Sequence, residues 1–243
     1  MRGAESVDTV RDEGGRVVTL SRPSGPFVVA VVGFLFSALP MIYLHLASIG
    51  RLSPVSHTIS DYIFLTHGGE LLALSAVSLA VGSAALLRVI LAVGVPRGGP
   101  VQVLFSVWCL GLLLAAVFPT DPLGSETSLP GAVHRYAGLA MFVSLPLAGF
   151  LLSVRFRESL AWSGAAIVVR RLSMVSAAVS VLFLLSHVPI VFSNGKGDEV
   201  LSGFLVQGLA ERLLFGSIFA LLGALLLGAR TALRRVEEVV PCP

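Results

Sequence analysis

Long apolar stretches separated by short polar segments dominate the chain. Six of these stretches carry few or no charged residues and approach the roughly 20 residues that a helix needs to cross the hydrocarbon core of a bilayer. The pattern predicts helices at residues 27–49, 71–87, 101–118, 137–154, 172–192 and 203–229. The expected fold is therefore all-α, a polytopic membrane bundle of six transmembrane helices.

The composition excludes a soluble protein. The chain has 243 residues, of which 55% are hydrophobic and 13% charged, and its mean hydropathy is +0.91. These values lie far outside the range of soluble globular domains. We expect a polar, mobile cytoplasmic tail at residues 1–26, the transmembrane domain at residues 27–230 and a cytoplasmic tail at residues 231–243. The first apolar stretch is too long for a signal peptide, so it is expected to remain as a helix.

Lys and Arg are unequally shared between the two sides of the predicted bundle. Thirteen of the 17 fall on the side that holds both termini, and four fall on the other side. Because cytoplasmic loops hold an excess of these residues, we expect both termini in the cytoplasm and the protein in the plasma membrane. This distribution also accounts for the net charge of +3, so nucleic acid is not an expected partner.

Groups that can exchange protons gather on the opposite, outer side. All five histidines and all three tyrosines fall in the outer half of the predicted bundle, together with seven of the 14 acidic residues. The outer end of the bundle is therefore the predicted location of a functional site.

The segment before the second predicted helix, residues 56–62, is dense in hydroxyls and also holds an imidazole and a carboxylate. Asp61 could act as an acid or base held by Ser60, with His57 as its proton partner. Alternatively, Ser60 or Asp61 caps a short interfacial helix, and Tyr62 belongs to the aromatic belt of the membrane interface. The sequence leaves both interpretations open.

Two further outer segments carry candidate residues at the third and fourth helices. Asp121 lies between two prolines that stiffen the chain, so it either points into the mouth of the bundle or solvates the turn. His134 and Arg135 open the fourth predicted helix. An Arg at a helix N-terminus opposes the helix dipole, so we expect it to pair with Asp121 or Asp61, or else to extend to the interface.

The fifth and sixth predicted helices add His187, Gln207, Glu211 and Arg212. The spacing of four puts Gln207 and Glu211 on one helical face. Glu211 lies about 15 Å into the bilayer if the helix starts near residue 201, and at the interface if only residues 213–229 span. An ionisable residue so near hydrocarbon is expected to be paired or functional. His187 is a lone imidazole on an apolar helix, of a kind that is often hydrogen-bonded inside a core.

No spacing of residues demands a metal or a cofactor. The chain contains no HExxH, CxxC, DDxxD or GxSxG pattern. Its two cysteines, Cys109 and Cys242, lie in regions that are not expected to meet. We therefore expect neither a metal site nor a cofactor.

Four short motifs give the chain a resemblance to a known family. They are Ser-His-x-x-Ser-Asp-Tyr at residues 56–62, Phe-Pro-Thr-Asp-Pro at 118–122, His-Arg-Tyr-Ala-Gly at 134–138 and Gly-x-x-Glu-Arg at 208–212. In these motifs the chain resembles the DUF998 family of small bacterial membrane proteins, over about residues 27–230. The resemblance implies a membrane fold and supports the polar positions, but it supplies no reaction.

The leading hypothesis is a membrane enzyme that acts on a lipid-like or isoprenoid substrate in a pocket at the outer end. Its candidate acids and bases are Asp61, Asp121 and Glu211, because an apolar pocket favours a protonated carboxyl that can protonate an alkene or epoxide. The sharpest version is a protonation-initiated terpene (meroterpenoid) cyclase, by analogy of architecture with small membrane-embedded cyclases. Eight residues are candidates for binding or orienting the substrate: His57, Ser60, Tyr62, His134, Arg135, His187, Gln207 and Arg212.

Two alternatives stay open. In a transporter or channel component, the same acids with Arg135 and Arg212 would form a proton or cation relay, although no internal repeat supports this. In a non-enzymatic accessory protein, the polar cluster would clamp the helices together. The expected partners are the lipid bilayer and an apolar or isoprenoid small molecule.

Overall fold

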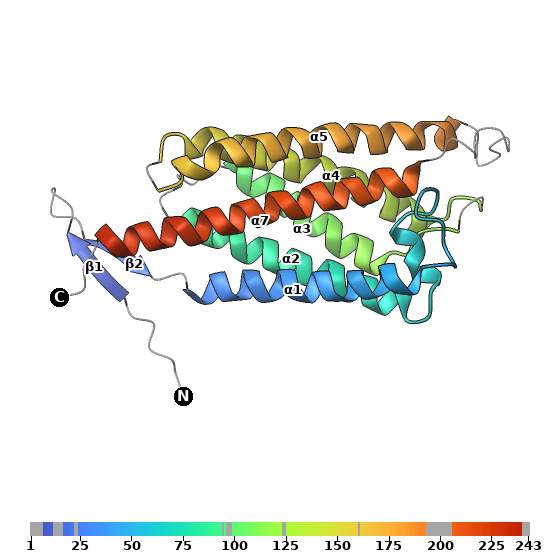
Figure 1. The fold of residues 1–243 in the computed structure, drawn as a ribbon, viewed down its shortest axis with the longest axis horizontal. Coiled ribbons are helices and arrows are strands. Elements are labelled where there is room, and N and C mark those ends of the chain that lie inside the picture. The colour runs from blue at the N-terminus through green and yellow to red at the C-terminus, as the bar shows by residue number, and fades with distance from the viewer. Residues whose placement is uncertain are drawn as a thin grey trace.

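Six long apolar helices form an elongated bundle in the computed structural model, which describes residues 7–11, 17–21, 24–93, 95, 99–122, 125–159, 161–192 and 206–239 (Figure 1). The helices are α1 (Ser24–Ala47), α2 (Gly68–Ala92), α3 (Gly99–Val117), α4 (Leu129–Phe156), α5 (Ser163–Phe192) and α7 (Gln207–Val239). Each contains a segment long and apolar enough to cross a membrane. The predicted membrane bundle of six helices is therefore confirmed.

The start of α1 and the end of α7 lie at the same end of the bundle, because the six helices alternate in direction (Figure 1). We call this end the tail end. The opposite end carries the loop after α1, the loop after α3 and the start of α7, and we call it the cluster end. A short 3₁₀ helix, η1 (Ser60–Phe64), lies in the loop between α1 and α2.

A two-stranded antiparallel hairpin precedes α1 at the tail end. It pairs β1 (Val7–Arg11) with β2 (Val17–Ser21), and Val7 lies opposite Ser21. The hairpin is not among the elements that the sequence analysis predicts, because the charged residues around the strands outweigh their short runs of Val and Thr. β-branched residues favour strands. Among the described residues, the hairpin is the one departure from an all-α fold.

Two helices begin well before their predicted starts. α4 begins at Leu129, because the Ser128 hydroxyl accepts a hydrogen bond from the amide of Gly131 at 3.1 Å and caps the helix. His134 therefore lies beyond the first turn in which it was expected. α5 begins at Ser163 and places Arg170 inside the helix. Capping and the helix propensity of Arg extend both helices past the apolar stretches that the sequence reveals.

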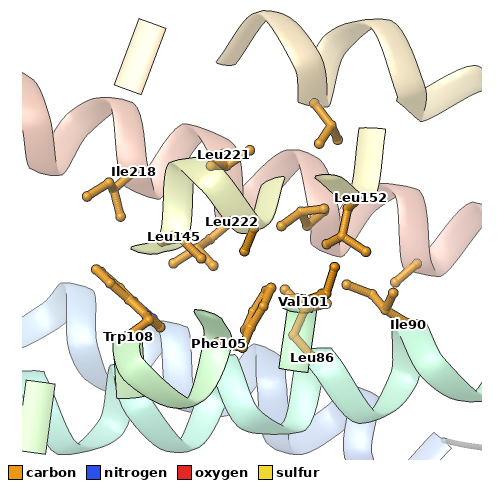
Figure 2. Packing of buried hydrophobic residues seen from close by; sticks show 14 of the residues in the cluster. Leu86, Ile90, Val101, Phe105, Trp108, Leu145, Leu152, Ile218, Leu221 and Leu222 are labelled. Carbon is orange, nitrogen blue, oxygen red and sulfur yellow. The ribbon is translucent and has the colours of Figure 1, made fainter. Parts of the chain in front are cut away.

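The interior of the bundle is filled by large side chains from several helices. Leu86 of α2, Trp108 of α3, Leu145 of α4 and Leu222 of α7 meet there and are at most 1% exposed (Figure 2). The indole of Trp108 donates to the hydroxyl of Ser83 at 3.0 Å, which satisfies the polar atom of the largest buried ring. Because lipid is as apolar as these side chains, close packing rather than exclusion of water holds the helices together.

Small residues let α1 pack closely against α2. A Cβ atom on Gly33 would lie 2.7 Å from the Cα of Gly82, so both positions need glycine. Near this crossing, the hydroxyl of Ser75 donates to the carbonyl of Ser37 at 2.8 Å. The opposite face of α1 is exposed, for example at Phe36, which is 54% accessible. α1 is therefore a peripheral helix with one free side.

Candidate functional site

The first turns of α7 meet the loop between α1 and α2 at the cluster end. The Glu211 carboxylate is 3% exposed and accepts a hydrogen bond from the backbone amide of Ile59. Asp61, 7% exposed, accepts from the amide of Thr58 at 2.7 Å and from its hydroxyl at 3.0 Å. The structure therefore brings two of the three predicted acids together, and both hold the backbone or side chains of the loop.

Arg212 holds the same loop through its carbonyls. Its Nη1 atom donates to the carbonyl oxygens of Pro54 at 2.9 Å and His57 at 2.7 Å, and to that of Gly208 at 2.9 Å. Its Nη2 atom donates to the Tyr62 hydroxyl at 2.9 Å. Because Nη1 carries two hydrogens and has three carbonyls within reach, at least one hydrogen is shared between two carbonyls, and the planar guanidinium thereby serves four acceptors.

Gly208 allows α7 to approach the loop. A Cβ atom at this position would collide with the carbonyl oxygen of His57. The adjacent amide of Leu209 donates to the carbonyl of Val55 at 3.1 Å, which adds a backbone link at the same place. His57 contacts α7 through its backbone carbonyl. Its ring binds elsewhere, because Nδ1 accepts a hydrogen bond from the amide of Ser53 at 3.2 Å. The predicted His57–Asp61 proton pair is not formed among the described contacts.

Tyr62 connects this cluster to α1. The ring is fully buried, and its edge meets the imidazole of His45 with centroids 5.2 Å apart. The Ser48 hydroxyl approaches the Tyr62 hydroxyl at 3.5 Å and donates to the carbonyl of His45 at 2.8 Å. Tyr62 is one of the orienting residues predicted from the sequence, whereas His45 is not. The available signal was a lone imidazole near the end of an otherwise apolar helix.

A shallow groove of about 340 Å³ lies between α1 and α7 next to His45. Its lining is apolar apart from the imidazole, and it consists of Ala38, Met41, Ile42, His45, Leu46 and Phe219. The Nδ1 atom of His45 is 2.9 Å from the carbonyl of Met41. No carboxylate belongs to the lining residues, so the predicted pocket walled by acids is absent from this part of the described structure.

His134 forms a second link at the cluster end. Its Nδ1 lies 2.8 Å from the carbonyl of Phe118, and its Nε2 lies 3.1 Å from the Ser60 hydroxyl. A carbonyl can only accept, so Nδ1 carries the proton and Nε2 accepts from Ser60. His134 thereby connects the ends of α3 and α4 to η1, as a structural bridge between three chain segments.

Asp121 lies apart from the other two acids. Its carboxylate accepts from the Ser128 amide at 3.0 Å and from the Ser128 hydroxyl at 2.6 Å, so it supports the cap of α4. This is the turn interpretation of Asp121. Arg135 is exposed and contacts the Thr127 hydroxyl at 3.4 Å, with no described carboxylate as its partner. Of the two alternatives for Arg135, the pair with Asp121 or Asp61 is not formed among the described residues, and its exposed position agrees with extension to the interface.

The remaining candidates lie near the start of α7. Gln207 is 2% exposed and its amide donates to the carbonyl of Ser186 at 2.9 Å, which ties α7 to α5. The side chain of His187 lies outside the described residues. Because α7 begins at Gln207, Glu211 lies about 6 Å along the helix from its first residue. The start of α7 thus favours the shallow of the two depths considered for Glu211. Among the described residues, no three His, Cys, Asp or Glu side chains are grouped as metal ligands.

A protein-family model matches most of the chain. The family model described as "Protein of unknown function (DUF998)" matches residues 28–228. No curated protein and no solved structure matches the chain.

Proposed function

Because the chain belongs to the DUF998 family, whose description assigns no function, we propose a function from the geometry of its own residues. The protein binds a lipid-like or isoprenoid molecule from the bilayer in the groove between α1 and α7. The observation that carries this proposal is the chain of contacts from His45 in the groove through Tyr62 to the half-buried Arg212. Such a chain places one fixed polar group beside an otherwise apolar groove.

The groove suits an apolar chain with one polar group. Ile42 and Leu46 on its rim are 56% and 63% exposed, so a molecule dissolved in the bilayer can enter from the side. The Met41 carbonyl occupies Nδ1 of His45, so a hydroxyl, carbonyl or phosphate group of the ligand would meet Nε2. An isoprenoid alcohol or its phosphate has this combination of groups.

Glu211 and Arg212 are positioning residues in this proposal. They fix the loop between α1 and α2, and the loop holds Tyr62 against His45. Because Glu211 is buried, losing its hydrogen bond would leave the amide of Ile59 unpaired at a cost of about 1–3 kcal/mol, whereas the half-buried Arg212 can replace part of its hydrogen bonds with water. In this proposal the polar cluster holds the helices together and, by doing so, also positions His45 for binding.

We extend the proposal to orientation and location. The cluster end faces outward and both termini lie in the cytoplasm of a bacterium, because the arginines concentrate at the tail end. A membrane-impermeant maleimide added to intact cells should label a cysteine introduced at Ser53, and should label Cys242 only after the cells are opened. Labelling of Cys242 in intact cells would reverse the orientation.

The catalytic form of the proposal is a protonation-initiated terpene (meroterpenoid) cyclase that uses Asp61 or Glu211 as the acid. It requires the loop between α1 and α2 to move, since the groove lining includes no carboxylate and both acids hold loop groups. Binding without catalysis needs no such movement, so we favour it. A proton or cation relay is less well supported, because none of the described spans carries an Asp or Glu near its middle.

Photocrosslinking tests the binding proposal. The full-length protein in lipid nanodiscs would be exposed to a polyprenyl alcohol that carries a photoreactive diazirine, and the labelled peptides would be identified by mass spectrometry. Ala38→Trp fills the groove and should remove most labelling of α1 and α7. Ala140→Trp is the matched control, because Ala140 lines a similar apolar groove of about 350 Å³ between α3 and α4.

Equal loss of labelling with Ala38→Trp and Ala140→Trp, or no loss with either, would show that the probe contacts the protein only as bulk lipid. Conversion of isoprenoid substrates by the same nanodiscs would support the catalytic form. That form fails if no product is formed while labelling of the α1–α7 groove is retained.

A further inference from the structure

Two arginines of α5 lie on a face that is otherwise apolar and open to lipid. Around Arg171, the exposed residues are Ile167, Val168, Met174 and Val175, each at least 50% accessible. Because α5 begins at Ser163, Arg170 lies about 10 Å along the helix from its start. These guanidinium groups therefore lie beside hydrocarbon-facing side chains rather than in a polar loop.

Arg170 is held by an aromatic ring. Its Cζ atom lies 5.8 Å from the centre of the Phe150 ring on α4, and Phe150 is itself 38% exposed. A cation–π contact fixes the guanidinium without using its N–H donors. In the described part of the bundle, neither Arg170 nor Arg171 has a carboxylate partner within salt-bridge distance.

An arginine on a lipid-facing surface needs an anionic partner, because an unpaired charge near hydrocarbon is costly. On the side of the tail end, the sequence has 13 Lys and Arg against seven Asp and Glu. The tail end carries Arg155, Arg157, Arg170, Arg171, Arg230, Arg234 and Arg235 along α4, α5 and α7. Along the same segments, the sequence has three acidic residues: Glu158, Glu237 and Glu238. The local excess of positive charge selects a negatively charged molecule.

We propose that Arg170 and Arg171 bind the phosphate of an anionic phospholipid, whose acyl chains lie along the exposed face of α5 and beside Phe150. Two guanidinium groups can hold one phosphate through charge-assisted hydrogen bonds. The apolar residues that continue along α5, such as Met174 and Val175, then contact the acyl chains. This site is at the tail end, so it is separate from the groove at His45.

The structure at the tail end makes this surface rigid. The indole of Trp162 donates to the carbonyl of Val93 at 2.6 Å and stacks on Phe156 with ring centroids 4.5 Å apart. A Cβ atom on Gly228 would lie 3.0 Å from the Cβ of Ala165, so α7 packs tightly on the first turns of α5. Because α5 packs between α4 and α7, the backbone positions of Arg170 and Arg171 are set without a bound lipid.

Native mass spectrometry of the full-length protein in detergent tests the proposal. Phosphatidylglycerol should bind with an affinity at least about tenfold higher than phosphatidylcholine, since each Arg near an anionic lipid contributes about 1 kcal/mol. The double variant Arg170→Gln/Arg171→Gln should lose this preference. The control Arg230→Gln/Arg234→Gln removes the same charge from α7 and should keep it.

Two further measurements keep the proposal open to refutation. If the double variant does not fold, the melting temperature of the unaltered protein must still rise more with phosphatidylglycerol than with phosphatidylcholine. Inorganic phosphate at millimolar concentration should not displace the lipid. Equal binding of both lipids, equal losses in both double variants, or full displacement by inorganic phosphate would each overturn the assignment of an anionic lipid.

Discussion

Ile59 and Glu211 lie 152 positions apart in the chain, yet the backbone amide of Ile59 donates a hydrogen bond to the carboxylate of Glu211. Both groups are buried, so neither can exchange its partner for water. Glu211 is thereby tied to one defined place on the loop between α1 and α2. The cluster end is held together by side chains of α7 that satisfy the backbone of a distant loop.

Replacing Glu211 separates a positioning role from an acid–base role. Glu211→Gln retains an oxygen that can accept from Ile59, so we expect a loss of stability of about 1 kcal/mol and retained labelling of the groove. Glu211→Ala leaves the buried amide unpaired and should cost about 1–3 kcal/mol. Thermal unfolding in detergent measures both. Glu70→Ala, at an exposed position of α2, is the control.

A catalytic role for Glu211 predicts a different pattern. Glu211→Gln would then abolish product formation while the melting temperature stays close to that of the unaltered protein. If Glu211→Gln and Glu211→Ala unfold at the same temperature, the hydrogen bond to Ile59 does not support the loop.

Arg212→Lys tests whether the shape of the guanidinium matters. A lysine carries the same charge but cannot donate to three carbonyls and the Tyr62 hydroxyl at once. We expect a loss of stability of about 2 kcal/mol and weaker labelling of the groove between α1 and α7. Arg51→Lys, at an exposed position of the same end, should change neither. A fully stable Arg212→Lys variant would mean that charge alone is sufficient.

Gly208→Ala tests the close approach of α7 to the loop. The added Cβ would meet the backbone carbonyl of His57, which cannot move without breaking its bond to Arg212. We expect a loss of about 1–3 kcal/mol, as for an overpacked core. Gly216→Ala is the matched control on the same helix. Its Cβ would meet open space, so it should be neutral or stabilising by up to about 1 kcal/mol. Similar melting temperatures for the two variants would contradict the tight contact.

The sequence predicts the membrane class of this fold well because lipid imposes one simple requirement. Every span must be apolar over a minimum length, and that signal is local. The starts of α4 and α5 are less predictable, because a cap such as Ser128 and arginines such as Arg170 extend a helix beyond its apolar core. The strands β1 and β2 have five residues each, which is too short for an alternation of apolar and polar residues to be recognised in the sequence.

The candidate site is only partly predictable for a different reason. Asp61, Tyr62, Glu211 and Arg212 form one cluster, as motif reasoning suggested, because ionisable residues near hydrocarbon need partners. Several of their partners are backbone amides and carbonyls. Because every residue has these groups, the sequence does not show which of them will be the partner. His45 was missed because its importance comes from lying beside Tyr62 and lining the groove.

Asp121 should be dispensable for ligand binding. Its carboxylate supports the Ser128 cap of α4 and lies apart from the groove. Asp121→Ala is expected to lower stability by about 1 kcal/mol, as for the loss of a helix cap, and to leave photolabelling of α1 and α7 unchanged. Ser128→Ala should have a similar effect on the melting temperature, since it removes the same cap. Loss of labelling with Asp121→Ala at an unchanged melting temperature would place Asp121 in the binding site.

Tyr62→Phe tests the connection between the buried cluster and the groove. The substitution removes the hydroxyl that accepts from Arg212 but keeps the ring that meets the edge of His45. Because one N–H of the half-buried guanidinium then lacks its acceptor, we expect a loss of about 1 kcal/mol and a shift of the loop. If the loop positions His45, photolabelling of α1 in the variant should fall several-fold at a temperature at which the variant is still folded. Tyr43→Phe, at a residue that is 58% exposed, should leave both quantities unchanged. Lower stability with full labelling would instead show that the cluster holds the bundle together without shaping the groove.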